Sequence, residues 1–417
     1  MNKILTNGLR KIHQRGGETE GGQSVHDSTR NTSRRAHPAL AMIFAALAGS
    51  AFGAAPINVP LKPANWTTKG DVKFQKIEGF PNGLMENKGG AVLNGLVFKN
   101  GTIDVDVKFG KGISTIIFRR DDDMGEALVL RPQPNCPASS DCIQYTPVMH
   151  GAFLWDLYPQ YQTKAPLSDK EWNYIRIVAA GKRMKVFMNG LSQPVLSIER
   201  MAGTLSEGSL RLSGPASWAN LVITPDADDG LPSTPVPDPS ASDNHFVRTW
   251  NVSPSVHVAT TVDKKVDGNI GTLPPNDSGD EPSWKWRHLV SETDGLVNLS
   301  REVGSSKKGD EVSGVWLSTI LRSDREQTKH VHLGWVREIA VFVNGNPVFH
   351  ERNLYGSSEQ KEPDGRLGLE NGQFDLPLRK GDNTVRVFVD DNFGAAQHFG
   401  WGMKMRLDDI GGVHFQS

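Results

Sequence analysis

Acidic and basic side chains gather in a turn-rich stretch between Arg119 and Arg131. A run of three aspartates, Asp121–Asp123, follows two arginines, and Glu126 opens the next apolar run. A carboxyl group can give or take a proton in glycoside cleavage, and a planar guanidinium holds carboxylates or hydroxyls through paired hydrogen bonds. Glu126 is therefore the candidate acid or base. The alternatives for the aspartate run are a solvated turn and a calcium site built from oxygen ligands.

A long loop, Gln133–Pro166, supplies side chains that could bind a ligand. Connections longer than about 12–15 residues are usually functional or disordered, and the aromatic content of this loop argues against disorder. Aromatic faces can stack on sugar rings, although the same tryptophans could simply pack in a core. His150 has no sequence partner for a triad or a metal site, so a surface role is its alternative. The candidate ligand-binding residues are Arg119, Arg131, Gln144, Tyr145, His150 and Trp155.

Cys136 and Cys142 are the only cysteines of the chain and lie six residues apart. In an oxidising compartment they are predicted to form a disulfide. The bridge either tidies the loop or holds the segment with His150 and Trp155 over a binding face.

Three strand patterns must position these side chains: Thr102–Phe109, Ser114–Arg120 and Glu126–Pro132. All three are rich in β-branched residues, and in the first one apolar and polar side chains alternate strictly. They are predicted to be neighbours in an antiparallel sheet. We expect Arg119, Arg131 and Gln144 to point into one concave face of that sheet, beneath the loop.

The whole chain is predicted to be all-β, with two β-sandwich (jelly-roll) domains in tandem joined by a Pro-rich linker. Short strand patterns with turn residues between them recur over residues 55–225 and 244–417, and residues 226–243 are rich in Pro, Asp and Ser. Strands are expected at residues 329–333 and 338–343, among others. Asn189-Gly190 and Asn344-Gly345 predict hairpin turns, because both residue types tolerate positive φ.

Residues 1–54 are predicted to be a signal region with a long polar preamble. Ala39–Phe52 is apolar for fourteen residues and follows Arg34 and Arg35. A membrane-spanning helix needs about 20 such residues, so the stretch fits the apolar core of a secretory signal. We therefore expect a secreted or periplasmic protein with no membrane span. A buried hydrophobic helix is the alternative.

The charge composition of the chain limits the classes of partner that it could bind. The 417 residues carry 46 basic and 47 acidic side chains, a net charge of −1. This balance gives no basic surplus for a nucleic-acid partner. The 43 glycines and 25 prolines agree with a turn-rich β protein.

Two stretches resemble known families. From Leu96 to Asn189 the order of Phe118-Arg119, Trp172-Asn173 and Asn189-Gly190 resembles the concanavalin-A-like laminin-G/glucanase jelly roll, particularly the 3-keto-disaccharide hydrolase family. This resemblance implies glycoside cleavage by the first domain. The E-x-D-x-x-E motif of family 16 glycoside hydrolases, which share the fold, is missing.

The second stretch, from Trp335 to Trp401, resembles the galactose-binding-like jelly roll, with Leu376-Pro377-Leu378 and Gly381-Asp382-Asn383 as its strand and turn. This resemblance implies an accessory carbohydrate-binding module.

Together these features predict a secreted protein that engages an oligo- or polysaccharide through the concave face of its first domain. If that domain is a glycoside hydrolase, Glu126 is the catalytic candidate. The alternatives are a non-catalytic lectin-like or surface-adhesion protein and a structural cell-envelope protein. No cofactor is required by any motif, and calcium is the one metal that the acidic turns suggest, at Asp121–Asp123 or at residues 276–281.

Overall fold

The computed structural model describes residues 54–258, 260–263, 268–271, 284–305, 312–391 and 399–416. The predicted signal sequence therefore lies outside the described residues. Within them, strands dominate, and the helical elements are α1 (Leu299–Val303) and the 3-10 turns η1 (Pro63–Asn65), η2 (Pro159–Tyr161) and η3 (Thr293–Gly295). The all-β prediction is confirmed. None of the helical elements in the described ranges has the length and apolar character needed to span a membrane.

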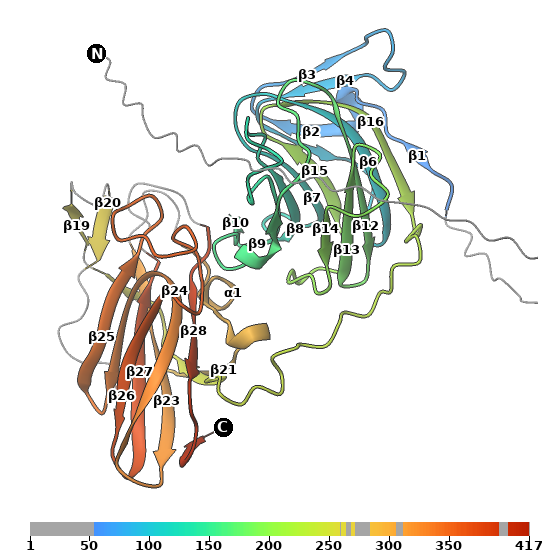
Figure 1. Ribbon diagram of the computed structural model, residues 1–417. Helices are drawn as coiled ribbons and strands as arrows, with labels where there is room; N and C mark the ends of the chain where they lie inside the picture. The colour runs from blue at the N-terminus through green and yellow to red at the C-terminus, as the bar shows by residue number, and fades with distance from the viewer. Residues whose placement is uncertain are drawn as a thin grey trace, which may run out of the picture. The chain divides into compact units, whose positions relative to one another are not determined.

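The first sandwich consists of two antiparallel sheets (Figure 1). Sheet one has the order β14 (Leu196–Ile198), β13 (Arg183–Met188), β12 (Asn173–Ala180), β6 (Gly101–Phe109), β16 (Ala216–Pro225), β4 (Leu84–Asn87) and β3 (Val72–Gln75), with β1 (Ile57–Asn58) beside β16. Sheet two has the order β10 (Ala152–Phe153), β9 (Ile143–Met149), β8 (Gly125–Leu130), β7 (Ser114–Arg120), β15 (Ser209–Ser213), β5 (Gly90–Leu93) and β2 (Trp66–Lys69), with β11 (Gln162–Thr163) beside β9.

The alternation predicted for β6 decides which of its side chains are buried between the two sheets. Ile103, Val105 and Val107 belong to the core of the first sandwich and are fully buried. Asp104 points the other way and pairs with Arg176 on β12, 3.0 Å between Oδ1 and Nη1. The three strands from which the site was predicted are not all neighbours, because β7 and β8 pair in sheet two while β6 belongs to sheet one.

The second sandwich is built on a sheet with the order β21 (Arg287–Val290), β17 (Thr249–Val252), β23 (Ser313–Ser323), β27 (Gly381–Asp390), β24 (Gln327–Val343), β28 (Gly402–Leu407) and β22 (Val297–Asn298). Further strands pair with β23 and β24: β18 (Val256–His257), β29 (Val413–Phe415), β25 (Asn346–Asn353) and β26 (Gly372–Leu378). A separate two-stranded sheet contains β19 (Thr260–Asp263) and β20 (Gly268–Gly271).

Strand β24 belongs to both layers of the second sandwich. Its residues 327–336 pair with β26 and β28, whereas residues 337–343 pair with β25 and β27. The change of partner falls at Arg337, which has a φ of 86° and a buried side chain. The two strands predicted over residues 329–333 and 338–343 are therefore one strand that passes from one layer to the other.

The two predicted Asn-Gly hairpins are present. Asn189 and Gly190 have φ values of 51° and 75°, and Asn344 and Gly345 have φ values of 50° and 83°. Asn344 and Gly345 are the only two residues between β24 and β25, and positive φ at both is what a two-residue hairpin turn requires. Residues 189–195 join β13 to β14, and Asn189 and Gly190 form the first turn of this longer connection. The turn after β13 and the turn between β24 and β25 thus follow from local residue chemistry alone.

The connection between β16 and β17 contains no helix or strand. Leu231 is buried, the amide of Lys182 donates to the carbonyl of Ser233 at 3.0 Å, and the amide of Val236 donates to the carbonyl of Glu199 at 3.1 Å. The first part of the Pro-rich segment therefore lies along the first sandwich. Its predicted role as a semi-stiff spacer stays a prediction.

Candidate functional site

The residues predicted to share one concave face divide between the two faces of sheet two. Glu126 lies on the same strand as Leu128, at an interval of two, and Leu128 belongs to the core between the sheets. Tyr145, directly opposite Leu128 in the register, also belongs to that core. Gln144 is one residue removed from Tyr145 and points to the other face. The expectation of a single shared face is therefore wrong.

Glu126 is fully buried behind the segment that contains Gly203. Its Oε2 atom accepts from the Tyr145 hydroxyl at 2.6 Å and from the Gly203 amide at 3.3 Å, and the Tyr145 oxygen accepts from the Ala202 amide at 2.6 Å. Oε1 has no hydrogen-bond partner among the described residues. Burial raises the pKa of the Glu126 carboxyl, against the opposing effects of Tyr145 and Lys182.

Arg119 points into the same interior, where its guanidinium donates mainly to backbone carbonyls. Its Nε atom donates to the carbonyl of Lys99 at 2.7 Å, Nη1 donates to the carbonyl of Gly181, and Nη2 donates to the side chain of Asn100 at 3.2 Å. The side chain is 1% exposed. Arg119 therefore ties β7 to the strand ends of sheet one, and all three of its nitrogen atoms are engaged in doing so.

Arg131 and Gln144 lie together on the opposite face of sheet two. Arg131 Nη2 donates to Gln144 Oε1 at 2.8 Å, and the Arg131 guanidinium lies 4.9 Å from the centre of the Trp155 ring. Gln144 Nε2 donates to the carbonyls of Trp155 and Tyr158 at 2.8 and 3.1 Å. Burial, followed by the charge of Arg366, lowers the pKa of Arg131 to about 10. These side chains hold the loop in place.

Residues 133–166, predicted as one long loop, contain β9, β10, η2 and β11. Their part from Met149 to Tyr158 packs against the second sandwich and does not roof a binding face as expected. Five of its side chains belong to the buried cluster that forms the core of the second sandwich: Met149, Ala152, Leu154, Leu157 and Tyr158. The ring of Trp155 packs against Phe399 with centroids 4.0 Å apart. The apolar and aromatic content that favoured a ligand-binding loop is explained by this packing.

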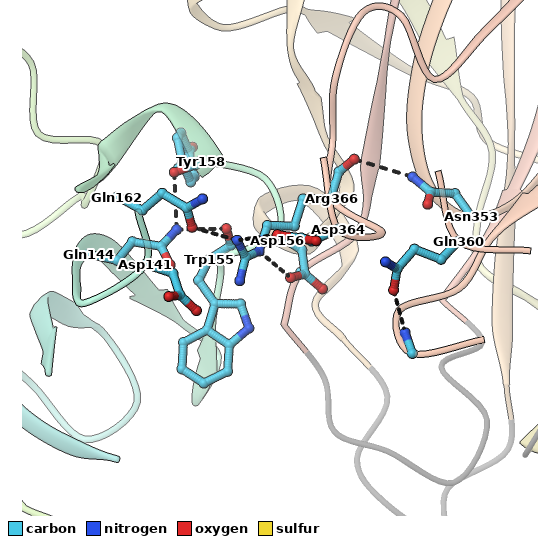
Figure 2. A network of polar contacts seen from close by, with 12 residues as sticks. Asp141, Gln144, Trp155, Asp156, Tyr158, Gln162, Asn353, Gln360, Asp364 and Arg366 are labelled. Carbon is cyan, nitrogen blue, oxygen red and sulfur yellow. Dashed lines mark hydrogen bonds and ion pairs between the residues drawn. The ribbon is translucent and has the colours of Figure 1, made fainter. Parts of the chain in front are cut away.

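Asp156 is the polar centre of this contact, as Figure 2 shows. Its carboxylate accepts from Arg337 Nη2 at 3.1 Å and lies 3.8 Å from Arg366 Nε. Arg366 Nη1 also donates to Gln162 Oε1 at 2.5 Å. Burial raises the pKa of the Asp156 carboxyl, and the neighbouring guanidinium groups act in the opposite direction.

His150 does not join either group. It occupies the turn between β9 and β10 with a φ of 50°, and its nearest carboxylate is that of Asp123, 3.9 Å from Nδ1. Asp121–Asp123 form an exposed turn between β7 and β8. Calcium at this turn stays a prediction, and residues 276–281 lie outside the described residues. The predicted disulfide between Cys136 and Cys142 is confirmed.

A cavity of about 380 Å³ lies next to the loop and is lined by both sandwiches and the connecting segment. We call it the junction cavity. Its polar and aromatic lining comes from distant parts of the chain: Tyr158, Gln160, Tyr161, Lys182, Arg200, Asp238, Ser291, Glu292, Thr293 and Lys404. Tyr158, Gln160 and Tyr161 lie in the stretch Gln133–Pro166 from which ligand binding was predicted. The other lining residues were not predicted to bind a ligand, because residues so far apart share no local motif.

The two tyrosines form one wall of the junction cavity. The rings of Tyr158 and Tyr161 are nearly parallel, 8° apart, with centroids 6.0 Å from each other. The Tyr158 hydroxyl donates to Glu292 Oε2 at 2.8 Å and accepts from Asn298, and the Tyr161 hydroxyl donates to the carbonyl of Arg200 at 3.2 Å. Both rings are thereby fixed in orientation.

Charged side chains of both signs line the rest of the junction cavity. Glu292 Oε1 accepts from Arg301 Nε at 2.5 Å, and Lys182 Nζ donates to the carbonyl of Gly203. Burial lowers the pKa of the Lys182 and Lys404 ammonium groups. Donors, acceptors and aromatic faces in one small concavity are the groups that orient a polar ligand with apolar ring faces.

Comparison with known proteins finds one matching family model, and it covers the first sandwich. Residues 62–221 match the model of the 3-keto-alpha-glucoside-1,2-lyase-like domain family, which confirms the resemblance stated for the first sandwich. No curated protein matches the chain. The match covers β2 to β16 and leaves the second sandwich outside it.

Similar solved structures include three proteins that act on or bind carbohydrate. The first is the carbohydrate-binding module CBM66 of Bacillus subtilis, with 18% identity over 38% of this chain and 95% of that chain and a TM-score of 0.29. The second is domain 4 of AbnA, a GH43 extracellular arabinanase of Geobacillus stearothermophilus, in complex with arabinotriose, with 12% identity over 41% of this chain and 81% of that chain and a TM-score of 0.27. The third is the beta-glucanase of Bacillus licheniformis, with 10% identity over 42% of this chain and 99% of that chain and a TM-score of 0.29.

Proposed function

We propose that this chain is an exported carbohydrate-binding protein and that the junction cavity is its saccharide site. The observation that carries the proposal is the pair of parallel rings, Tyr158 and Tyr161, beside hydrogen-bonding side chains of both signs. An aromatic face attracts the C–H face of a pyranose, while Lys182, Glu292 and Lys404 can bond its hydroxyls. A ligand there would touch both sandwiches at once.

Export is supported by two sequence features. The apolar stretch Ala39–Phe52 fits a secretory signal. The disulfide between Cys136 and Cys142 fits an oxidising compartment such as the periplasm or the exterior of the cell.

Glycoside cleavage is the second candidate, and the family match over residues 62–221 favours it. Glu126 is sealed behind Gly203, so a saccharide in the cavity would meet Glu292 in its place. Lys182 and Lys404, whose pKa values are lowered by burial, are the cavity groups that could accept a proton. A lyase acting on a 3-keto glycoside would need such a base to remove the acidified proton next to the carbonyl.

The binding proposal is tested with a glycan array probed with the full chain, followed by calorimetric titration of the saccharide that binds best. Tyr161→Ala should weaken binding at least tenfold. Tyr174→Ala is the matched control, because Tyr174 is exposed on β12 and does not line the cavity. Absence of any bound glycan, or equal affinity of wild type and Tyr161→Ala, would overturn the assignment.

Catalysis is tested separately by incubating the same saccharide and its 3-keto derivative with wild type, Glu292→Gln and Lys182→Met. Loss of turnover in a variant that still binds would identify the enzyme and its reacting group. Binding without product in wild type would favour the lectin-like alternative.

A further inference from the structure

Two histidines and an aspartate meet on the outer face of the second sandwich. His330 and His332 are two residues apart on β24, and their neighbours Val331 and Leu333 point into the core. Both imidazoles therefore point outward from the same face. Asp408 follows β28, the strand that pairs with this part of β24. One ligand atom from each of the three side chains lies within 4.8 Å of the others.

The contact between His332 and Asp408 calls for a cation between its two atoms. His332 Nε2 lies 2.8 Å from Asp408 Oδ1, while His332 Nδ1 lies 3.1 Å from Glu370 Oε2. If Nδ1 carries the proton and donates to Glu370, Nε2 presents a lone pair toward the Asp408 oxygen. Two acceptors at this distance repel each other unless a cation, either a proton or a metal ion, lies between them.

The surrounding charge is negative on this patch. His330 Nδ1 lies 3.0 Å from Asp375 Oδ1, so three carboxylates surround two imidazoles. Arg406 faces His332 across the strand pair, but Asp243 engages its Nε atom at 3.0 Å. A cation bound between the histidines would thus be attracted by nearby carboxylates.

We propose that His330, His332 and Asp408 form a binding site for a divalent transition-metal ion of the zinc class. Imidazole nitrogen with one carboxylate suits zinc and its neighbours, whereas calcium and magnesium prefer oxygen alone. Zinc–nitrogen bonds are about 2.0–2.1 Å long, so modest side-chain rotation would bring the three groups onto one ion. Glu370 would be a positioning residue that fixes the tautomer of His332.

The test is a zinc titration of the full chain, purified without a polyhistidine tag and stripped with a chelator, in competition with a chromophoric zinc indicator. Wild type should bind one zinc ion more than His332→Ala or Asp408→Asn. Glu370→Gln should weaken that zinc by about 10- to 100-fold, as for other outer-shell partners of ligating histidines. Cobalt substitution should give a visible d–d absorption band in wild type that His332→Ala lacks.

His414→Ala is the matched control. His414 is exposed on β29 in the same sandwich and has a carboxylate partner, Asp324, 3.3 Å from Nε2, but it belongs to no three-residue group among the described residues. It should bind zinc as wild type does. Equal zinc stoichiometry and affinity in wild type and His332→Ala, with circular dichroism showing both folded, would overturn the proposal.

Discussion

The Asp156 carboxylate, in a loop of the first sandwich, accepts from Arg337 Nη2 at 3.1 Å at the residue where β24 passes between the layers of the second sandwich. Both side chains are almost fully buried. A backbone with positive φ at a bulky residue is strained, and Asp156 helps to hold it. The Asp156–Arg337 ion pair thus links the contact between the sandwiches to the point where β24 changes layer.

Asp156→Ala should destabilise the protein by about 3–5 kcal/mol, because it leaves buried guanidinium charge without its carboxylate. The measurement is urea unfolding followed by tryptophan fluorescence. Asp123→Ala, in an exposed turn, is the control and should change the unfolding free energy by less than about 0.5 kcal/mol. A loss of similar size in both variants would contradict the role given to Asp156.

Glu126 should make stability depend on pH. Its pKa is raised in the folded state, so the folded protein holds this proton above pH 4.5, the ordinary value, where the unfolded chain has released it. The contribution of Glu126 is therefore full below pH 4.5 and is lost as pH rises toward the folded pKa. Glu126→Gln should reduce the fall of the unfolding free energy with rising pH, as measured by urea midpoints from pH 4 to 8. Parallel curves for wild type and variant would refute it.

Removing the disulfide should lower stability by about 2 kcal/mol, the loop-closure contribution of a ring closed by cysteines six residues apart. The Cys136→Ser/Cys142→Ala variant should unfold at lower urea and should not respond to reductant. Reductant should lower the unfolding free energy of wild type by about 2 kcal/mol, which is the loss expected for the variant. A variant as stable as oxidised wild type would show that the bridge contributes nothing.

Gly203→Ala should destabilise the protein, because Gly203 lies between the junction cavity and Glu126. A Cβ atom at Gly203 would lie 2.5 Å from the Glu126 carboxyl, and such overpacking costs about 1–3 kcal/mol. The Gly203→Ala/Glu126→Ala double variant should lose less than the sum of the single variants, by at least about 0.5 kcal/mol, because the clash partner is gone. Strict additivity in urea unfolding would rule out the contact.

Local patterns in the sequence predicted the elements well. Alternation on β6 and the Asn-Gly turns are decided within a few residues, and the structure confirms both. The same alternation could have placed Glu126 correctly, since it shares a strand face with the apolar Leu128. The prediction that Glu126 meets a ligand rests on the chemistry of its carboxyl group, which does not determine the strand face on which the side chain lies.

The destination of the loop could not be predicted in this way. Leu154, Leu157 and Tyr158 are buried by a surface of the second sandwich, whose residues in this core begin at Val247. The junction cavity has the same origin, because Lys182, Glu292 and Lys404 meet only after both sandwiches are formed. Strand β24 runs without a break through Gly334, although an interior glycine often signals a bulge or the end of a strand.

The five loop side chains that complete the interior of the second sandwich also limit how this protein can be dissected. A fragment beginning at residue 244 would expose that interior to water. A fragment ending at residue 225 would expose the same five apolar loop side chains, because the core that buries them would be missing. The described residues from 54 to 416 belong to one compact unit that contains both sandwiches, so heating is expected to unfold them in one cooperative step. Cutting at the Pro-rich segment would therefore yield two aggregation-prone fragments and not two independently folding domains.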